Sequence, residues 1–238
     1  MRSSAGLIFF VAATALLRGQ PISTDRPAVA ESSTVVPKGS LQVENGFQIT
    51  SDQGQSTLDG PETELRFGVG NNTELRLSVP DYYHDAVTGF GDLAIGIKQQ
   101  LGPAAGFDVS IIAFLSLPTG AAGISSHGYD PGLQLPWSRK LSTNWTAAGQ
   151  LALYARNLTG QSTFLLDRQI TSPMDAFIEY AGEFPQRGGP QHLLHLGVAY
   201  KITPHNQLDV HYGIGLSSAE VNHFIGIGYS FRIQAFGH

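Results

Sequence analysis

Several charged residues in this sequence form pairs of opposite sign that lie two positions apart. In a β-strand the two members of such a pair share one face. Glu64 and Arg66 precede the segment 70–72, and Glu74 and Arg76 follow it. A three-residue Gly-Asn-Asn turn would place Arg66 opposite Arg76, with the two glutamates on the diagonals. The candidate residues for binding or selecting a solute are Glu64, Arg66, Glu74, Arg76, Asp92, Lys98, Lys201, Asp209 and His211.

A second hairpin repeats this arrangement near the C-terminus. The turn at 203–206 would set Lys201 opposite Asp209. Interleaved charges of both signs could hold a narrow interior shut, or they could form a constriction that selects what passes. The two interpretations are compatible, and both stay open.

Catalysis and metal binding have weaker support. Ser217 and Ser218 lie near His223, as a serine hydrolase would need, but a single histidine at a loop end is more often interfacial or solvated. His192 has the opposite strand parity to His195 and His211, so the three histidines do not share one face. We therefore expect no catalytic residues, no metal and no cofactor, with a lipid-modifying enzyme as the least favoured alternative.

The composition excludes further classes. The 238 residues include no cysteine, which rules out disulfides, cysteine-ligated metals and a thiol nucleophile. Fourteen basic residues against nineteen acidic ones, without a basic cluster, argue against nucleic acid as a partner. Charged residues make up only 14% of the chain, against about 25% in a soluble domain.

The N-terminus has the pattern of an export signal. Arg2 precedes an apolar run from Ala5 to Leu17, which is too short to span a membrane as a helix. We expect residues 1–20 to be a signal peptide and residues 21–38, which lack any periodicity, to be an N-terminal periplasmic leader.

From residue 39 the apolar residues alternate with polar ones, as in strands with one apolar face. In 207–216, for example, Leu208, Val210 and Tyr212 alternate with Asp209 and His211. We expect a barrel at 39–233 and a C-terminal overhang at 234–238. The predicted strands are 40–50, 61–69, 73–80, 89–101, 106–117, 132–141, 144–156, 162–170, 173–184, 191–202, 207–216 and 222–233.

The connections between these segments alternate in length. Those at 51–60, 81–88, 118–131, 157–161, 185–190 and 217–221 have five or more residues, and the others have four or fewer. Strands of about ten residues also match a tilted span of a bilayer better than the shorter strands of a soluble sandwich. The sequence therefore predicts an all-β, up-and-down antiparallel transmembrane barrel of twelve strands, with a soluble lipocalin-like or sandwich protein as the alternative.

The sequence also resembles the exported barrel proteins grouped as transporters of the meta-pathway of phenol degradation. The resemblance covers about 23–233 and rests on 23–27, 36–39, 42–46, 61–68, 74–77, 89–93 with Gly96 and Lys98, 117–120, 207–209 and 226–232.

This resemblance implies an outer-membrane channel or transporter for small, aromatic or hydrophobic molecules. Its partners would be the lipid bilayer, the solute and the barrel-insertion machinery. The alternative is a structural or binding barrel with a sealed lumen.

Overall fold

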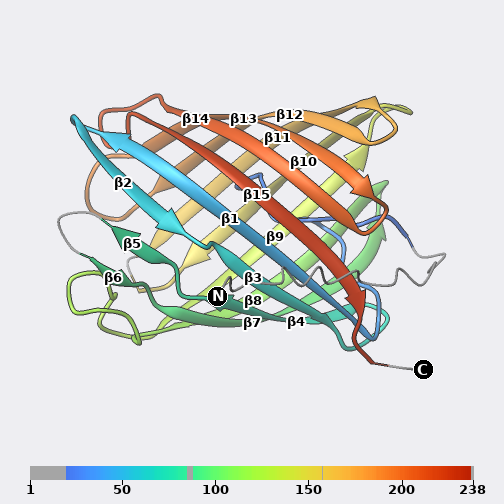
Figure 1. The fold of residues 1–238 in the computed structure, drawn as a ribbon, viewed down its shortest axis with the longest axis horizontal. Coiled ribbons are helices and arrows are strands. Elements are labelled where there is room, and N and C mark those ends of the chain that lie inside the picture. Colours follow the sequence, from blue (N-terminus) through green and yellow to red (C-terminus); the bar gives the residue numbers. More distant parts are fainter. Residues whose placement is uncertain (1–19, 85–87, 157, 237–238) are drawn as a thin grey trace, which may run out of the picture.

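The computed structural model describes residues 20–84, 88–156 and 158–236, and these residues form a closed antiparallel barrel of twelve strands (Figure 1). Each strand pairs with the next along the chain, and β15 pairs with β1 through Ser40 and Gln234 to close the cylinder. The elements are β1 Ser40–Asp52, β2 Gln55–Gly60, β3 Thr63–Gly68, β4 Thr73–Val79, β5 Tyr82–His84, β6 Gly89–Phe90, β7 Leu93–Ala104, β8 Phe107–Leu117, β9 Asp130–Lys140, β10 Trp145–Tyr154, β11 Thr159–Thr171, β12 Met174–Phe184, β13 Gln191–Thr203, β14 Asn206–Gly215 and β15 His223–Gln234.

The predicted twelve-stranded architecture is confirmed, although three barrel strands are interrupted. Each of these three barrel strands consists of two shorter strands in line: β2 with β3, β4 with β5, and β6 with β7. The first of these breaks at Gly60-Pro61, where proline has no N–H to donate to the ladder. No helix among the described residues is long and apolar enough to cross a membrane.

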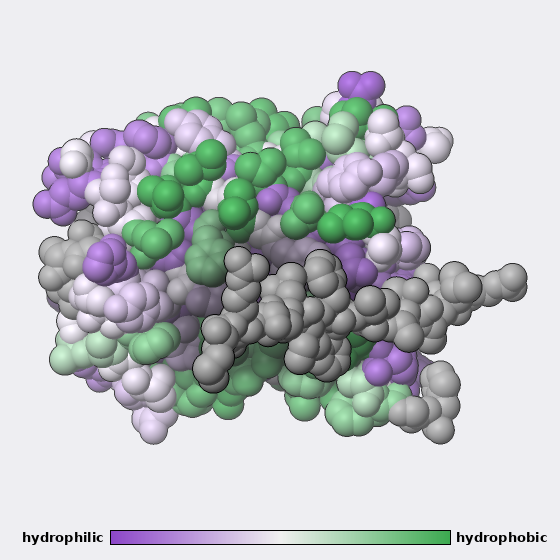
Figure 2. Space-filling model, viewed as in Figure 1, coloured by the Kyte–Doolittle hydropathy of each residue, from purple (hydrophilic) through white to green (hydrophobic). Residues whose placement is uncertain are grey.

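The barrel is apolar outside and polar inside. Along β15, Ile225, Ile227 and Tyr229 are exposed, whereas Ser230 is fully buried. Figure 2 shows apolar side chains across the middle of the visible face and hydrophilic ones toward both ends of the long axis. A surface of this kind suits a lipid environment and leaves polar groups to line the interior.

Four of the predicted long connections, 51–60, 81–88, 118–131 and 157–161, are partly strand in the structure. The segment 51–60 was expected to be a loop, but β1 and β2 continue into it and join through Gln53-Gly54, which both have positive φ. β11 begins at Thr159, within the expected connection 157–161. The prediction failed here because the polar tips of strands lack a buried face and so carry no alternating pattern.

The two ends of the barrel nevertheless differ. The turns at 105–106, 172–173 and 204–205 lie at the end with both barrel termini, named here the turn end. The longest connection, 118–129, lies at the opposite end, named the loop end. The predicted signal peptide falls almost entirely outside the described residues. Of the predicted overhang, Gln234 belongs to β15, Ala235 and Phe236 donate backbone N–H groups to Gly39 O, and the last two residues lie outside the description.

The leader, residues 21–38, runs through the barrel interior (Figure 1). Three glycines of the wall make room for it. A Cβ at Gly46 would lie 2.1 Å from Arg26 Cζ, and one at Gly228 would lie 2.5 Å from Arg26 Nε. A Cβ at Gly68 would lie 2.2 Å from the Pro37 carbonyl oxygen. The barrel sequence is thus fitted to the leader.

Candidate functional site

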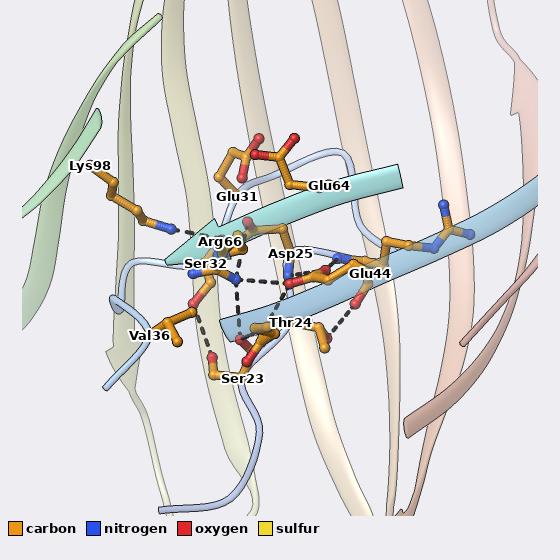
Figure 3. A network of polar contacts seen from close by, with 12 residues as sticks. Ser23, Thr24, Asp25, Glu31, Ser32, Val36, Glu44, Glu64, Arg66 and Lys98 are labelled. Carbon is orange, nitrogen blue, oxygen red and sulfur yellow. Dashed lines mark hydrogen bonds and ion pairs between the residues drawn. The ribbon is translucent and has the colours of Figure 1, made fainter. Parts of the chain in front are cut away.

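Arg66 of β3 is the centre of a buried polar network inside the barrel. Its Nε and Nη2 donate to the two carboxylate oxygens of Glu74 at 2.9 and 3.0 Å, and its Nη1 donates to Glu44 Oε1 at 2.9 Å. All three side chains are 0% exposed. Arg66 also donates to the carbonyl oxygens of Ser23 and Thr34, so it holds two points of the leader (Figure 3).

Arg76 and Lys98 extend this network toward the leader carboxylates. Arg76 Nη1 lies 2.9 Å from Asp25 Oδ2, and its Nη2 lies 2.8 Å from Glu31 Oε2. Lys98 Nζ lies 3.5 Å from Asp25 Oδ1. The register places Arg66 opposite Arg76, as expected from the turn, and the carboxylates between them offset the repulsion of the two guanidiniums. Arg66, Arg76 and Lys98 together are named the arginine wall.

Glutamates of the barrel wall also bind the backbone of the leader. Glu44 Oε2 accepts the N–H groups of Asp25 and Arg26, each at 2.9 Å. The two oxygens of Glu179 accept the N–H groups of Val29 and Ala30, each at 2.8 Å. Hydrogen bonds to an ionised acceptor are about twice as strong as neutral ones. The leader therefore has anchors on two separate strands of the wall, β1 and β12.

Arg26 joins the leader to a third group of side chains. Its guanidinium pairs with Glu62, lies 3.4 Å from Asp209 Oδ1 and lies 3.2 Å from His211 Nε2. His211 Nδ1 is 3.0 Å from His195 Nε2. His195 Nδ1 is in turn 3.0 Å from Glu179 Oε2. His195 of β13 and His211 of β14 are named the histidine wall.

Seven of the nine predicted site residues lie at the leader. Glu64, Arg66, Glu74, Arg76 and Lys98 form one group with Asp25 and Glu31, and Asp209 and His211 meet Arg26. The expected pairing of Lys201 with Asp209 is wrong. Lys201 lies opposite Gln207 and forms an ion pair with Asp175, because the turn is shorter than expected and shifts the register.

Asp92 organises a loop and lies apart from the leader. Its carboxylate accepts the backbone N–H groups of Gly120 and Ser126, each at 2.8 Å. Partial burial acts to raise its pKa, but the hydrogen bonds from Ser126 and Gly120 hold the pKa of this carboxyl below its usual range. Asp92 is therefore a fixed anion that orders the connection 118–129.

The proposed Ser-His pairing has no support in the geometry. Ser217 Oγ donates to Pro190 O, and the His223 ring lies beside Tyr212. Within the described ranges no hydrogen bond joins Ser217 to His223. Sequence reasoning missed Asp25, Arg26 and Glu31 as site residues, because the site was sought by strand parity and the leader has no periodicity; the stretch 23–27, which carries part of the family resemblance, was the signal that could have found Asp25 and Arg26.

Three cavities border the leader. One of about 180 Å³ lies toward the loop end, between Ile112, Phe114 and Tyr154 on one side and Glu31, Glu64 and Arg76 on the other. Cavities of about 440 and 720 Å³ lie toward the turn end and share Thr34 of the leader. The leader and its ion pairs thus separate the interior into compartments.

Solved structures of several outer-membrane proteins share this fold. The COG4313 outer membrane channel from Pseudomonas putida F1 aligns with a TM-score of 0.66 at 10% identity, over 85% of this chain and 98% of the other. The porin NanC aligns at 0.59 and 12% identity, over 81% of this chain and 100% of that one. KdgM, a porin solved in complex with disordered oligogalacturonate, aligns at 0.60 and 10% identity, over 81% and 98%.

The sequence comparison is more specific than the shared fold. No curated protein matches the chain. One family matches residues 24–233, which include both the leader from Thr24 onward and nearly the whole barrel. The chain belongs to the family described as "Putative MetA-pathway of phenol degradation".

Proposed function

We propose that the protein is a channel of the bacterial outer membrane whose lumen is closed by the leader and opens when the leader moves. The observation that carries this proposal is the leader itself, held across a polar lumen by Arg66, Glu44 and Glu179. The apolar outer surface supports a place in a bilayer. The turn end would face the periplasm after removal of a signal peptide at residues 1–20 and assembly by the barrel-insertion machinery.

The cavity toward the loop end supports a solute the size of one aromatic ring. Its volume is about 180 Å³, and a cavity of about 150 Å³ binds benzene in an engineered protein. Phe114 and Tyr154 meet edge to face at 5.6 Å on its apolar side. Glu64 and Arg76 supply polar partners for a substituent. We therefore propose small aromatic molecules with a polar group as the solutes, in line with the family description.

Deletion of residues 22–36 from the full chain tests the closure. The ion current through purified protein in planar bilayers should be small for the wild type and should rise by at least tenfold for the deletion variant. Phenol added on the loop side should lower that current, and Phe114→Ala with Tyr154→Ala should weaken this block.

A sealed structural barrel is the competing function, and the same experiment separates the two. A deletion variant that folds as a barrel but passes no more current than the wild type would establish the sealed lumen. Glu44→Gln with Glu179→Gln provides a second route, because it weakens the leader anchors without shortening the chain.

A further inference from the structure

The histidine wall contains a chain of hydrogen bonds whose direction is fixed at both ends. Arg26 has only donors, so His211 Nε2 must accept from its Nη2 at 3.2 Å. Glu179 is an acceptor, so His195 Nδ1 must carry a proton and donate to Oε2 at 3.0 Å. Between the rings, His211 Nδ1 then donates to His195 Nε2 at 3.0 Å. Both histidines are neutral in this arrangement, and each ring has one proton.

One additional proton cannot be placed in this chain without breaking it. His195 Nδ1 keeps its proton for Glu179, and the space between the two rings holds only one proton. The extra proton must therefore appear on His211 Nε2, where it faces the Arg26 guanidinium. This holds whichever ring takes up the proton, because the shared hydrogen bond can shift between His195 and His211. Two donors and an added positive charge then meet at the leader.

The repulsion between a protonated His211 and Arg26 would act directly on the leader, because the two histidines are buried beside it. His195 is 1% exposed and His211 is 6% exposed, so water does not separate them from their partners. The Phe177 and Phe224 rings lie against His195 at 5.3 and 5.4 Å and offer no acceptor for an extra proton. The same chain joins two separate leader contacts, because Arg26 is at one end and Glu179, which binds Val29 and Ala30, is at the other.

We propose that His195 and His211 form an acid-sensitive lock, which holds the leader when both are neutral and releases it when the pair takes up a proton. This inference rests on the proposed function, since release matters only if the leader closes the lumen. The charged and titratable groups that face the pair are Arg26 of the leader, Glu62 after β2, Glu44 of β1, Glu179 of β12 and Asp209 of β14.

The pH window follows from linkage. The closed state excludes the extra proton, whereas histidines freed into an open, wet lumen would accept it near the ordinary histidine pKa of about 6.5. Closure is therefore complete above about pH 6.5, and the ratio of closed to open protein falls by up to about tenfold for each further pH unit when one proton is taken up. Carboxylates of the interior, among them Asp209 beside Arg26, are titratable as well, so the comparison with a His211 variant is what assigns the response between pH 7.5 and 5.5 to the histidines.

The test compares currents in planar bilayers at pH 7.5 and 5.5. The wild-type current should rise by up to about tenfold on acidification. His211→Asn should abolish the rise, because asparagine can accept from Arg26 but does not titrate in this range. His192→Asn is the matched control: His192 lies on the same strand as His195, its ring contacts Tyr180 on the outer face, and the variant should respond as the wild type does.

A cross-link provides a measurement that does not depend on histidine variants. Ser33 Oγ of the leader lies 2.8 Å from Ser138 Oγ of β9, and the chain has no cysteine of its own. Ser33→Cys with Ser138→Cys should give a disulfide that abolishes the acid response, and reduction should restore it. A response that persists in His211→Asn, or in the oxidised double variant, would overturn the lock.

The result for the leader deletion separates this inference from the proposed function. If the wild type shows no acid response while the deletion variant conducts, the lock is wrong and the closed channel stands. If the deletion variant does not conduct either, the proposed function itself is wrong.

Discussion

The two walls that hold the leader use different chemistry. The arginine wall binds Asp25 and Glu31 through permanent charges, and Arg66 alone contacts three carboxylates. The histidine wall binds Arg26 through a neutral ring nitrogen and through Asp209. Guanidiniums stay charged at any physiological pH, whereas histidine changes its charge within that range. The difference suggests that one side fixes the leader and the other side can release it.

The largest expected effect comes from breaking the arginine wall. Arg66→Ala leaves buried carboxylates of Glu44, Glu74 and Asp25 without their main partner. Loss of one partner of a buried ion pair costs about 3–5 kcal/mol. The free energy of unfolding in detergent micelles, measured by denaturant titration, should fall by this amount.

Arg168→Ala is the control for that measurement. Arg168 is exposed and lies over the Trp145 ring at 5.3 Å, so its loss should cost about 0.5–1 kcal/mol. Equal losses for both variants would mean that Arg66 is not the centre of the structure and that the two walls do not differ as described.

Glu179→Gln tests the connection between the histidine wall and the leader. The change removes the charge that accepts from Val29 N–H, Ala30 N–H and His195, each a charge-assisted hydrogen bond. A loss of about 1.5–3 kcal/mol of leader binding would raise the current at neutral pH by about tenfold or more. Glu183→Gln is the matched control, because Glu183 lies on the same strand and accepts from Gln161. A similar current in both variants would contradict the anchoring role.

Gly228→Ala tests how closely the wall fits Arg26. The added Cβ would lie 2.5 Å from Arg26 Nε and 2.6 Å from the Asp209 carboxylate oxygens, and overpacking of this kind costs about 1–3 kcal/mol. The leader should shift, with a higher current at neutral pH and a barrel of unchanged strand content. Gly160→Ala has open space around the new Cβ and should behave as the wild type. An unchanged current in Gly228→Ala would show that closure of the lumen does not depend on the position of Arg26.

Strand parity predicted the barrel and part of the arginine wall because both depend on local alternation. It placed Arg66 opposite Arg76 from one turn, and it assigned His195 and His211 to one face. It could not place the leader, since Val29 and Ala30 bind a glutamate about 150 residues away and nothing in their own spacing signals that partner. The Lys201 pairing failed because a difference in turn length changes every cross-strand partner.

The smallest expected effect concerns Asp92, a charge that faces neither wall. Because its pKa is held below the usual range, the stability that it gives to 118–129 is present at neutral pH and is lost as the pH falls below about 4. Asp92→Asn should increase protease cleavage of this connection at pH 7 and leave barrel unfolding unchanged, because both of its hydrogen bonds go to the connection. As the pH falls further below 4, amide exchange at Gly120 and Ser126 in the wild type should progressively approach that of the variant measured at the same pH. If Asp92→Asn raised the neutral-pH current instead, this carboxylate would belong to the closure after all, and the two walls would not be sufficient to hold the leader.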